Sequence, residues 1–205
     1  MPPSQEHMEA TYSKLYGRIS KTASNRFYAS RRLKAHNTIS LWTISLFSLG
    51  LILVSLLQAL SVPLGLSDKL VNLVQVLLSV AILIISIIVS MSNYGVRSEQ
   101  FHACGLELNA MALKLERVEN QPCDKVTYDE LTDAYETVLK RYSNHETIDY
   151  LMMKTQKYEF YNLGALKIVV IYIRFFLHFL PYVILLALEC LWIYKLLTSA
   201  FRHAV

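Results

Sequence analysis

Two long apolar segments without a charged residue dominate the first half of the chain, at 39–60 and 70–91. Each has about the 20 residues that a helix needs to cross the hydrocarbon core of a bilayer. Nine residues separate them, and these include Pro63 and Gly65, which break helices. The pattern therefore predicts a tight antiparallel transmembrane hairpin over 39–91.

Lysine and arginine are distributed unequally around this hairpin. Seven of them precede the first span, and one, Lys69, lies in the connecting turn. Because basic residues are retained on the cytoplasmic side during insertion, we expect a cytoplasmic N-terminus and an external turn. Residues 1–38 then form a cytoplasmic basic amphipathic helix, and residues 92–166 form a cytoplasmic helical region.

Apolar residues recur in the cytoplasmic region at spacings of three and four, which is the period of a helix with one apolar face. The members of these stripes are Phe101, Cys104, Leu108, Met111, Leu115 and Val118, followed by Tyr128, Leu131, Tyr135, Val138 and Tyr142. The N-terminal helix offers a similar stripe at Tyr12, Tyr16, Ile19 and Ala23. We expect these faces to pack on one another or on another subunit.

A third apolar segment covers 168–197 and is less regular than the first two. Residues that interrupt it include Arg174, His178, Pro181 and Glu189. Two interpretations stay open: a third membrane helix within 167–205, which we favour, and a helix lying in the plane of the membrane. If the segment crosses fully, the C-terminus is external.

Composition agrees with an all-α integral membrane protein and argues against several other classes. Hydrophobic residues make up 54% of the chain and charged residues 18%, against about 25% charged in ordinary soluble domains. A net charge of +4, with the bases gathered beside the membrane segments, gives no reason to expect direct nucleic-acid binding. No phosphate-binding loop, catalytic set or metal-ligand motif is present, so we expect no enzyme, cofactor or metal.

Polar residues inside the two spans fall on one side of each helix. They are Ser45, Ser48, Ser55 and Gln58 in the first span, and Asn72, Gln75, Ser79, Ser86 and Ser90 in the second. Such stripes can hydrogen-bond one helix to another. They can also line a water-filled lumen, which two spans cannot enclose alone, so this interpretation requires a homo-oligomer.

Two polar clusters lie outside the spans. The first is basic and precedes the membrane: Arg26, Arg31, Arg32, Lys34 and His36. It can attract anionic lipid headgroups or pair with acids on other helices, such as Glu99, Glu107 and Glu116. The second cluster is Asn144, His145, Glu146, Asp149 and Tyr150, which suits either a capping network or a contact surface for a partner.

At these same residues the chain resembles the SLATT family of two-transmembrane effectors. The matching features are Arg26-Phe27, Arg31-Arg32 and His36 before a serine-bearing span, and then the tight hairpin. Arg97, Phe101-His102-Ala103-Cys104-Gly105 and the segment Ser143–Tyr150 look most like the branch encoded beside reverse transcriptases. The resemblance covers about residues 10–165, and the third apolar segment extends beyond the two-helix core of the family.

The resemblance implies a prokaryotic antiphage-defence effector of the inner membrane. Members are thought to oligomerise and form pores, or disrupt the membrane, once a cytoplasmic partner or signal activates them, and abortive infection follows. The implied operon partner is a reverse transcriptase or a nucleotide-signal synthase. A non-conducting scaffold that anchors a reverse transcriptase complex is the alternative. In both cases the cytoplasmic clusters, with Arg97 and His102, become candidates for coupling or partner contact.

Overall fold

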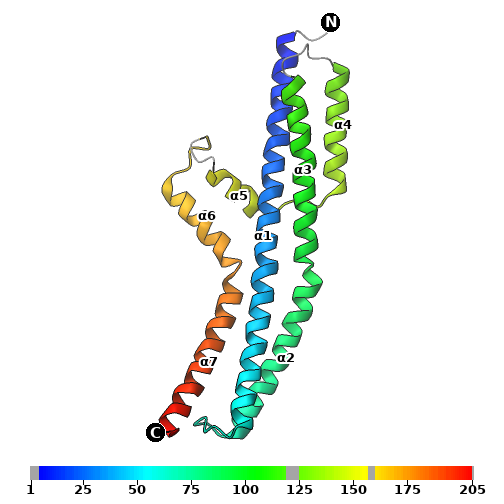
Figure 1. The fold of residues 1–205 in the computed structure, drawn as a ribbon. Helices are drawn as coiled ribbons and strands as arrows, with labels where there is room; N and C mark the ends of the chain where they lie inside the picture. Colours follow the sequence, from blue (N-terminus) through cyan, green and yellow to red (C-terminus); the bar gives the residue numbers. More distant parts are fainter. Residues whose placement is uncertain (1–4, 119–124, 157–159, 205) are drawn as a thin grey trace. The chain divides into compact units, whose positions relative to one another are not determined.

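A computed structural model describes residues 5–118, 125–156 and 160–204, and every regular element in these ranges is an α-helix (Figure 1). The elements are α1 (Gln5–Ala59), α2 (Asp68–Ser92), α3 (Tyr94–Val118), α4 (Lys125–Arg141), α5 (Thr147–Gln156), α6 (Ala165–Leu177) and α7 (Leu180–Ala204). The predicted all-α fold is confirmed. The helices form two units: a polar unit, Met1–Lys34 with Gly95–Phe175, and a membrane unit, Ala35–Tyr94 with Phe176–Val205.

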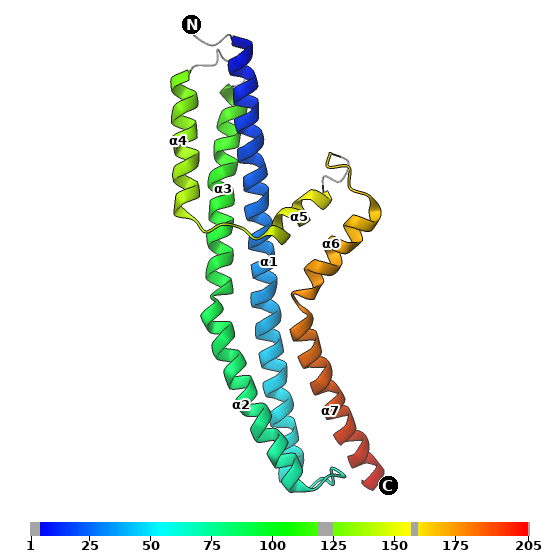
Figure 2. The same ribbon diagram turned by 180° about the vertical axis from the view of Figure 1, so that it is seen from behind.

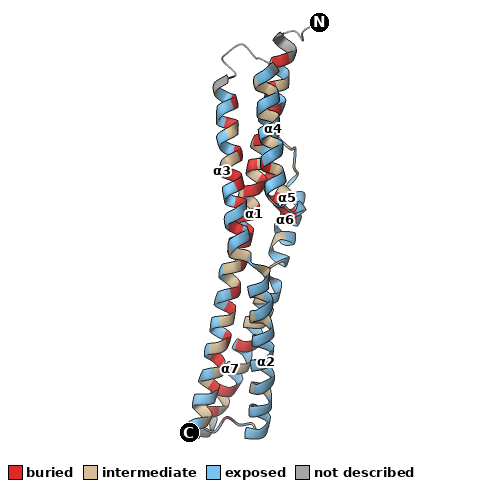
Figure 3. Cartoon of the chain, turned by 90° about the vertical axis from the view of Figure 1, so that its right-hand side faces the viewer, coloured by how far each residue is buried: buried red, intermediate tan, exposed pale blue. Residues whose placement is uncertain are grey.

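In the polar unit, α3 and α4 lie along the N-terminal part of α1 (Figures 1 and 2). Their facing sides carry the buried side chains (Figure 3), which are Met8, Tyr12, Leu15, Ile19, Ala23, Cys104, Leu108, Ala112, Leu115 and Val138. The predicted α3 stripe is thus largely in the core. On α1 the prediction was wrong at one position, because Leu15 is buried and Tyr16 is exposed.

A second small core joins α5 and α6 to α1 within the polar unit. Ile148, Met152 and Ile171 are buried there, with Tyr28 and Leu163 packed against them. This core holds α5 beside the part of α1 that carries Arg31 and Arg32. It is the reason that the residues around position 149 reach the arginines of α1.

The membrane unit contains the predicted hairpin, built from the C-terminal part of α1 and from α2. Both helices, and α7, are long and apolar enough to cross a membrane. The turn between the hairpin helices includes Gly65, whose φ of 68° is a left-handed conformation that glycine adopts without strain. Val71 is the one buried residue of α2, and most of the other residues of this helix are exposed (Figure 3).

The third apolar segment differs from the single helix that we expected over 168–197. It is divided between α6 and α7, and Phe179 lies between the two helices. The physical reason is Pro181, which falls in the first turn of α7, where its missing N–H group leaves no hydrogen bond unmade. The apolar stretch long enough to cross a membrane is Leu180–Ala200.

Candidate functional site

The centre of the polar unit is a buried ion pair between α1 and α5. Arg32 Nε donates to Asp149 Oδ1 at 2.8 Å, and Arg32 Nη2 donates to Asp149 Oδ2 at 3.1 Å. The two side chains are 5% and 1% exposed. Glu146 adds a contact of 2.9 Å to Nη2 from the solvent side. The two-point geometry fixes the orientation of both groups, which a buried charge pair requires in order to offset its desolvation.

This pairing differs from the one considered on the sequence. Arg32 pairs with Asp149 and Glu146 of the second polar cluster, rather than with the acids of α3. Glu107 of α3 pairs instead with Arg141, at 3.2 Å, and accepts a hydrogen bond from Tyr142. The separation of 117 residues between Arg32 and Asp149 explains why helical spacing could not reveal the pair.

Arg26 and His145 of the predicted clusters join α1 to the segment before α5, and Asn25 of α1, which was in neither cluster, takes part in this contact. Asn25 Nδ2 is 3.2 Å from His145 Nε2, and Arg26 donates to the carbonyl of Ser143. Asn25 Oδ1, Arg26 Nε and His145 Nδ1 are buried and have no hydrogen-bond partner among the described residues. Burial, followed by the charge of Arg26, lowers the pKa of His145. The contact between α1 and the segment before α5 therefore contains buried polar atoms, some of which have a hydrogen-bond partner and some of which lack one among the described residues.

The remaining predicted coupling residues occupy different surroundings. The Arg31 guanidinium lies 4.3 Å above the Tyr28 ring, and His102 meets the edge of Phe27 at 5.6 Å. Asn144 Oδ1 accepts a hydrogen bond from the His145 backbone N–H at 3.0 Å, so it caps the segment before α5. Arg97 is exposed. These residues therefore lie in separate surroundings and do not form one continuous site with the ion pair.

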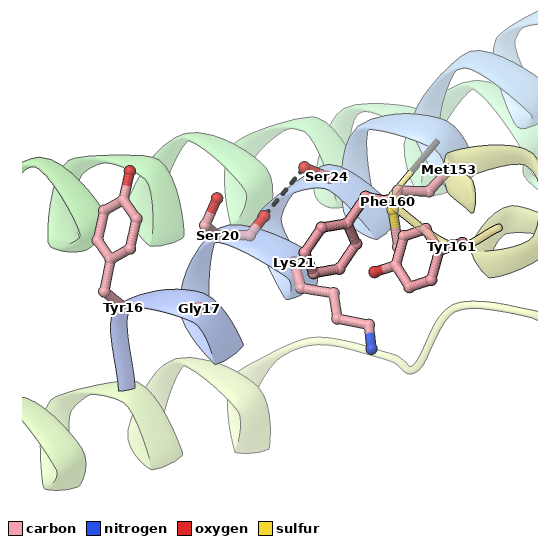
Figure 4. Close-up of a pocket in the computed structure, with 8 residues that line it drawn as sticks. All are labelled: Tyr16, Gly17, Ser20, Lys21, Ser24, Met153, Phe160 and Tyr161. Atoms are coloured by element: carbon pink, nitrogen blue, oxygen red, sulfur yellow. Dashed lines mark hydrogen bonds between the residues drawn. The ribbon is translucent and has the colours of Figure 1, made fainter. Parts of the chain in front are cut away.

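A pocket beside α1 that the sequence did not reveal is lined in part by Lys21 (Figure 4), whose ammonium group lies over the ring of Tyr150. The ammonium groups of Lys21 and Lys154 lie 4.9 Å and 4.4 Å from the centre of its ring, and Lys154 lowers the pKa of its phenol. The pocket, of about 410 Å³, is lined by Tyr16, Gly17, Ser20, Lys21, Ser24, Met153, Phe160 and Tyr161. Its aromatic and basic lining suits a small anionic molecule with a flat apolar part.

His36 lies in the membrane unit and is enclosed by aromatic side chains. Its ring stacks on Phe179 at 4.4 Å and on Tyr94 at 5.2 Å. Its Nδ1 is 3.4 Å from the Tyr182 hydroxyl. Stacking and hydrogen bonding hold α1, the residue that begins α3, and the start of α7 together at this point. The role expected for His36 as a headgroup anchor does not fit its burial.

The polar stripes of the two spans are divided in the structure. Near the turn they bond across the hairpin: Gln58 Nε2 donates to Asn72 Oδ1 at 3.0 Å, and Gln75 Nε2 donates to Ser55 Oγ at 3.3 Å. Further from the turn, Ser48 and Ser79 bond only to carbonyls of their own helices. Ser45, Ser79 and Ser90 are exposed and Ser86 is half-buried. Hydrogen bonding between helices therefore accounts for Ser55, Gln58, Asn72 and Gln75, and the lumen interpretation stays a prediction for the others.

One buried polar contact carried no signal in the sequence. Ser98 Oγ of α3 donates to the carbonyl of Ser30 on α1 at 2.9 Å, and both side chains are buried. Small hydroxyl residues on helices that are expected to pack would be the only guide to such a contact. The pair brings α1 and α3 close together at the end of the polar unit.

Three apolar helices, a hairpin with internal polar contacts and a polar helical unit with a buried ion pair define a helical membrane domain. The chain belongs to the SMODS and SLOG-associating 2TM effector domain family 5, whose family model matches residues 8–196. This family is associated with defence systems and is not a known enzyme family. The match reaches into α7, so the third apolar segment is part of the family pattern. Comparison with curated proteins and with solved structures finds no match to the chain.

Proposed function

We propose that this protein is an antiphage effector of the prokaryotic inner membrane. In this proposal it oligomerises and forms a pore, or disrupts the membrane, when a cytoplasmic partner or signal rearranges the polar unit. The N-terminus is then cytoplasmic, as the distribution of basic residues predicts. The partner is a reverse transcriptase or a nucleotide-signal synthase encoded beside it.

The observation that carries the proposal is the exposed serine face of the hairpin. Ser45, Ser79 and Ser90 are exposed on the protomer, in segments that are otherwise strongly apolar. A hydroxyl on a lipid-facing helix gains nothing from lipid, whereas it gains hydrogen bonds against a second copy or a water-filled lumen. Because α2 is almost wholly exposed, it is the surface that we expect to meet neighbouring copies.

The polar unit supplies the proposed means of control. Around the buried ion pair and His145, several buried polar atoms lack hydrogen bonds. A partner that supplies those hydrogen bonds would favour a different arrangement of the helices. A signal acts on such an element only through a difference in affinity for its two arrangements. Arg26, Arg32, His145 and Asp149 are therefore the residues through which we expect activation to act, with Arg31, Arg97 and His102 beside them.

A membrane-potential assay tests the proposal. Cells that express the chain together with its neighbouring genes should depolarise on activation, and proteoliposomes that contain the activated complex should release trapped dye. Ser79→Leu should abolish both effects without lowering the amount in the membrane. Val80→Leu, at an exposed apolar position of the same helix, is the matched control and should retain both. Cell death with intact polarisation would contradict the proposal.

The alternative function is a non-conducting scaffold that anchors a reverse transcriptase complex. It is favoured by the cross-hairpin hydrogen bonds, because four of the nine stripe residues, Ser55, Gln58, Asn72 and Gln75, already pack within one protomer. Replacing 39–91 with an unrelated hairpin separates the two functions. A scaffold keeps its activity after this exchange, and a pore loses it.

A further inference from the structure

α7 carries one ionisable acid in the middle of its apolar stretch. Between residues 180 and 194, Glu189 is the only charged residue, and it is 8% exposed. A carboxylate in the hydrocarbon region is costly, and such residues usually mark proton or ion sites. Neither the proposed pore nor the scaffold accounts for this residue.

The Glu189 carboxyl rests on the backbone of α1 at Gly50. A Cβ atom added to Gly50 would collide with Glu189 Oε1, and would lie 3.0 Å from Ile193 Cδ1. A glycine at this point leaves the space that the carboxyl occupies, and lets α7 approach α1 closely. The contact lies wholly within the membrane unit.

No positive charge faces the carboxyl from the helices around it. The spans 39–60 of α1 and 70–91 of α2 contain no lysine, arginine, histidine or acid. On α7, Tyr182 shares its face but lies two turns away beside His36, whereas Lys195 falls about 120° around the helix. The adjacent thiol, Cys190, is exposed. Among the described residues, no ion pair or hydrogen bond reaches the Glu189 carboxyl.

We propose that Glu189 is a proton-binding site within the membrane that fastens α7 to α1. The neutral acid fits the apolar contact and can donate its O–H to a backbone carbonyl. Loss of the proton to water leaves a carboxylate without a counter-charge in a medium of low dielectric constant. The ionised group then leaves Gly50 and moves toward water, so that α7 separates from α1. Protonation of one carboxyl thereby controls a contact between two membrane helices.

Labelling with dicyclohexylcarbodiimide tests the proposal on the full chain in native membranes. The acid adds across a C=N bond of the reagent and its proton moves to nitrogen, so the peptide gains the mass of the whole reagent. We expect Glu189 to be labelled at neutral pH, and labelling to fall by about tenfold per pH unit once the ionised form dominates. Asp68, exposed at the start of α2, is the internal control and should stay unlabelled. An unreactive Glu189 between about pH 5 and about pH 9 would overturn the proposal.

Substitutions at the contact give a second, independent measurement. Gly50→Ala fills the space of the carboxyl and should lower both Glu189 labelling and the thermal stability of the membrane unit. Adding Glu189→Ala should restore stability, because the two changes compensate in one space. Gly17→Ala meets open space and should leave labelling unchanged. Unaltered labelling in Gly50→Ala would show that Glu189 does not rest on Gly50, and would refute the proposed contact.

Discussion

The polar unit and the membrane unit distribute their side chains in opposite ways. In the polar unit apolar stripes are buried, and the buried charges have polar partners: Arg32 pairs with Asp149, and Arg26 donates to the carbonyl of Ser143. In the membrane unit most apolar side chains face outward. Polar side chains near the turn bond across the hairpin, whereas Ser48 and Ser79 bond to their own helices. The first unit can gain stability by removing apolar surface from water, whereas the second depends on lipid and on close contacts between its helices.

Breaking the buried ion pair should have the largest effect on the polar unit. Asp149→Asn leaves the Arg32 guanidinium buried and without its full charge partner, which costs about 3–5 kcal/mol of stability. Hydrogen exchange of α3 and α5 amides in the full chain measures this loss. Glu136→Gln removes the exposed pair with Lys140 and is the control, with an expected cost of about 0.5 kcal/mol. Equal protection in both variants would show that the pair does not stabilise the unit.

Truncating one apolar side chain in each unit compares them directly. Ile19→Ala leaves a cavity in the core of the polar unit and should cost about 2–5 kcal/mol. Leu83→Ala on exposed α2 should change stability by less than about 0.5 kcal/mol in detergent. Thermal unfolding followed by circular dichroism measures both. A large loss at Leu83 would show that a second copy covers this face of α2.

The long elements of both units could be predicted from the sequence, and the contacts between them could not. The spans at 39–60 and 70–91 are identified by their length and by their lack of charged residues. In the hydrocarbon core a chain can satisfy its backbone hydrogen bonds only as a helix or a closed barrel. Apolar stripes likewise indicated the core of α3, since helical period is a local property. The pairing of Arg32 with Asp149 depends on where α5 lies against α1, and no local pattern records that. Pro181 indicated an irregularity in the third apolar segment. That it lies in the first turn of α7 became clear only from the end of α6 at Leu177.

Removing a hydrogen bond across the hairpin should have a smaller effect. Asn72→Leu deletes the acceptor of the 3.0 Å bond from Gln58. Hydrogen bonds between membrane helices contribute about 0.6 kcal/mol on average, and at most about 1.7 kcal/mol. Steric trapping or unfolding in mixed detergent micelles can resolve such a difference. Leu73→Met, at the neighbouring exposed position, is the matched control. A loss of stability of the same size in this variant would show that the hydrogen bond does not stabilise the hairpin.

The smallest effect that we expect is a dependence on pH that belongs to the polar unit alone. Burial and the charge of Arg26 lower the pKa of His145, so the unfolded chain binds a proton more readily than the folded chain does. The contribution of His145 is therefore complete above about pH 6.5, the ordinary value for histidine. It is lost as the pH falls from there through the lowered folded pKa. Hydrogen exchange of α5 should report this loss, while the hairpin helices, which lack titratable side chains over 39–60 and 70–91, should not.

His145→Gln should flatten the profile, whereas His102→Gln, at an exposed position, should keep it. A profile that persists in His145→Gln would place the pH response elsewhere in the unit.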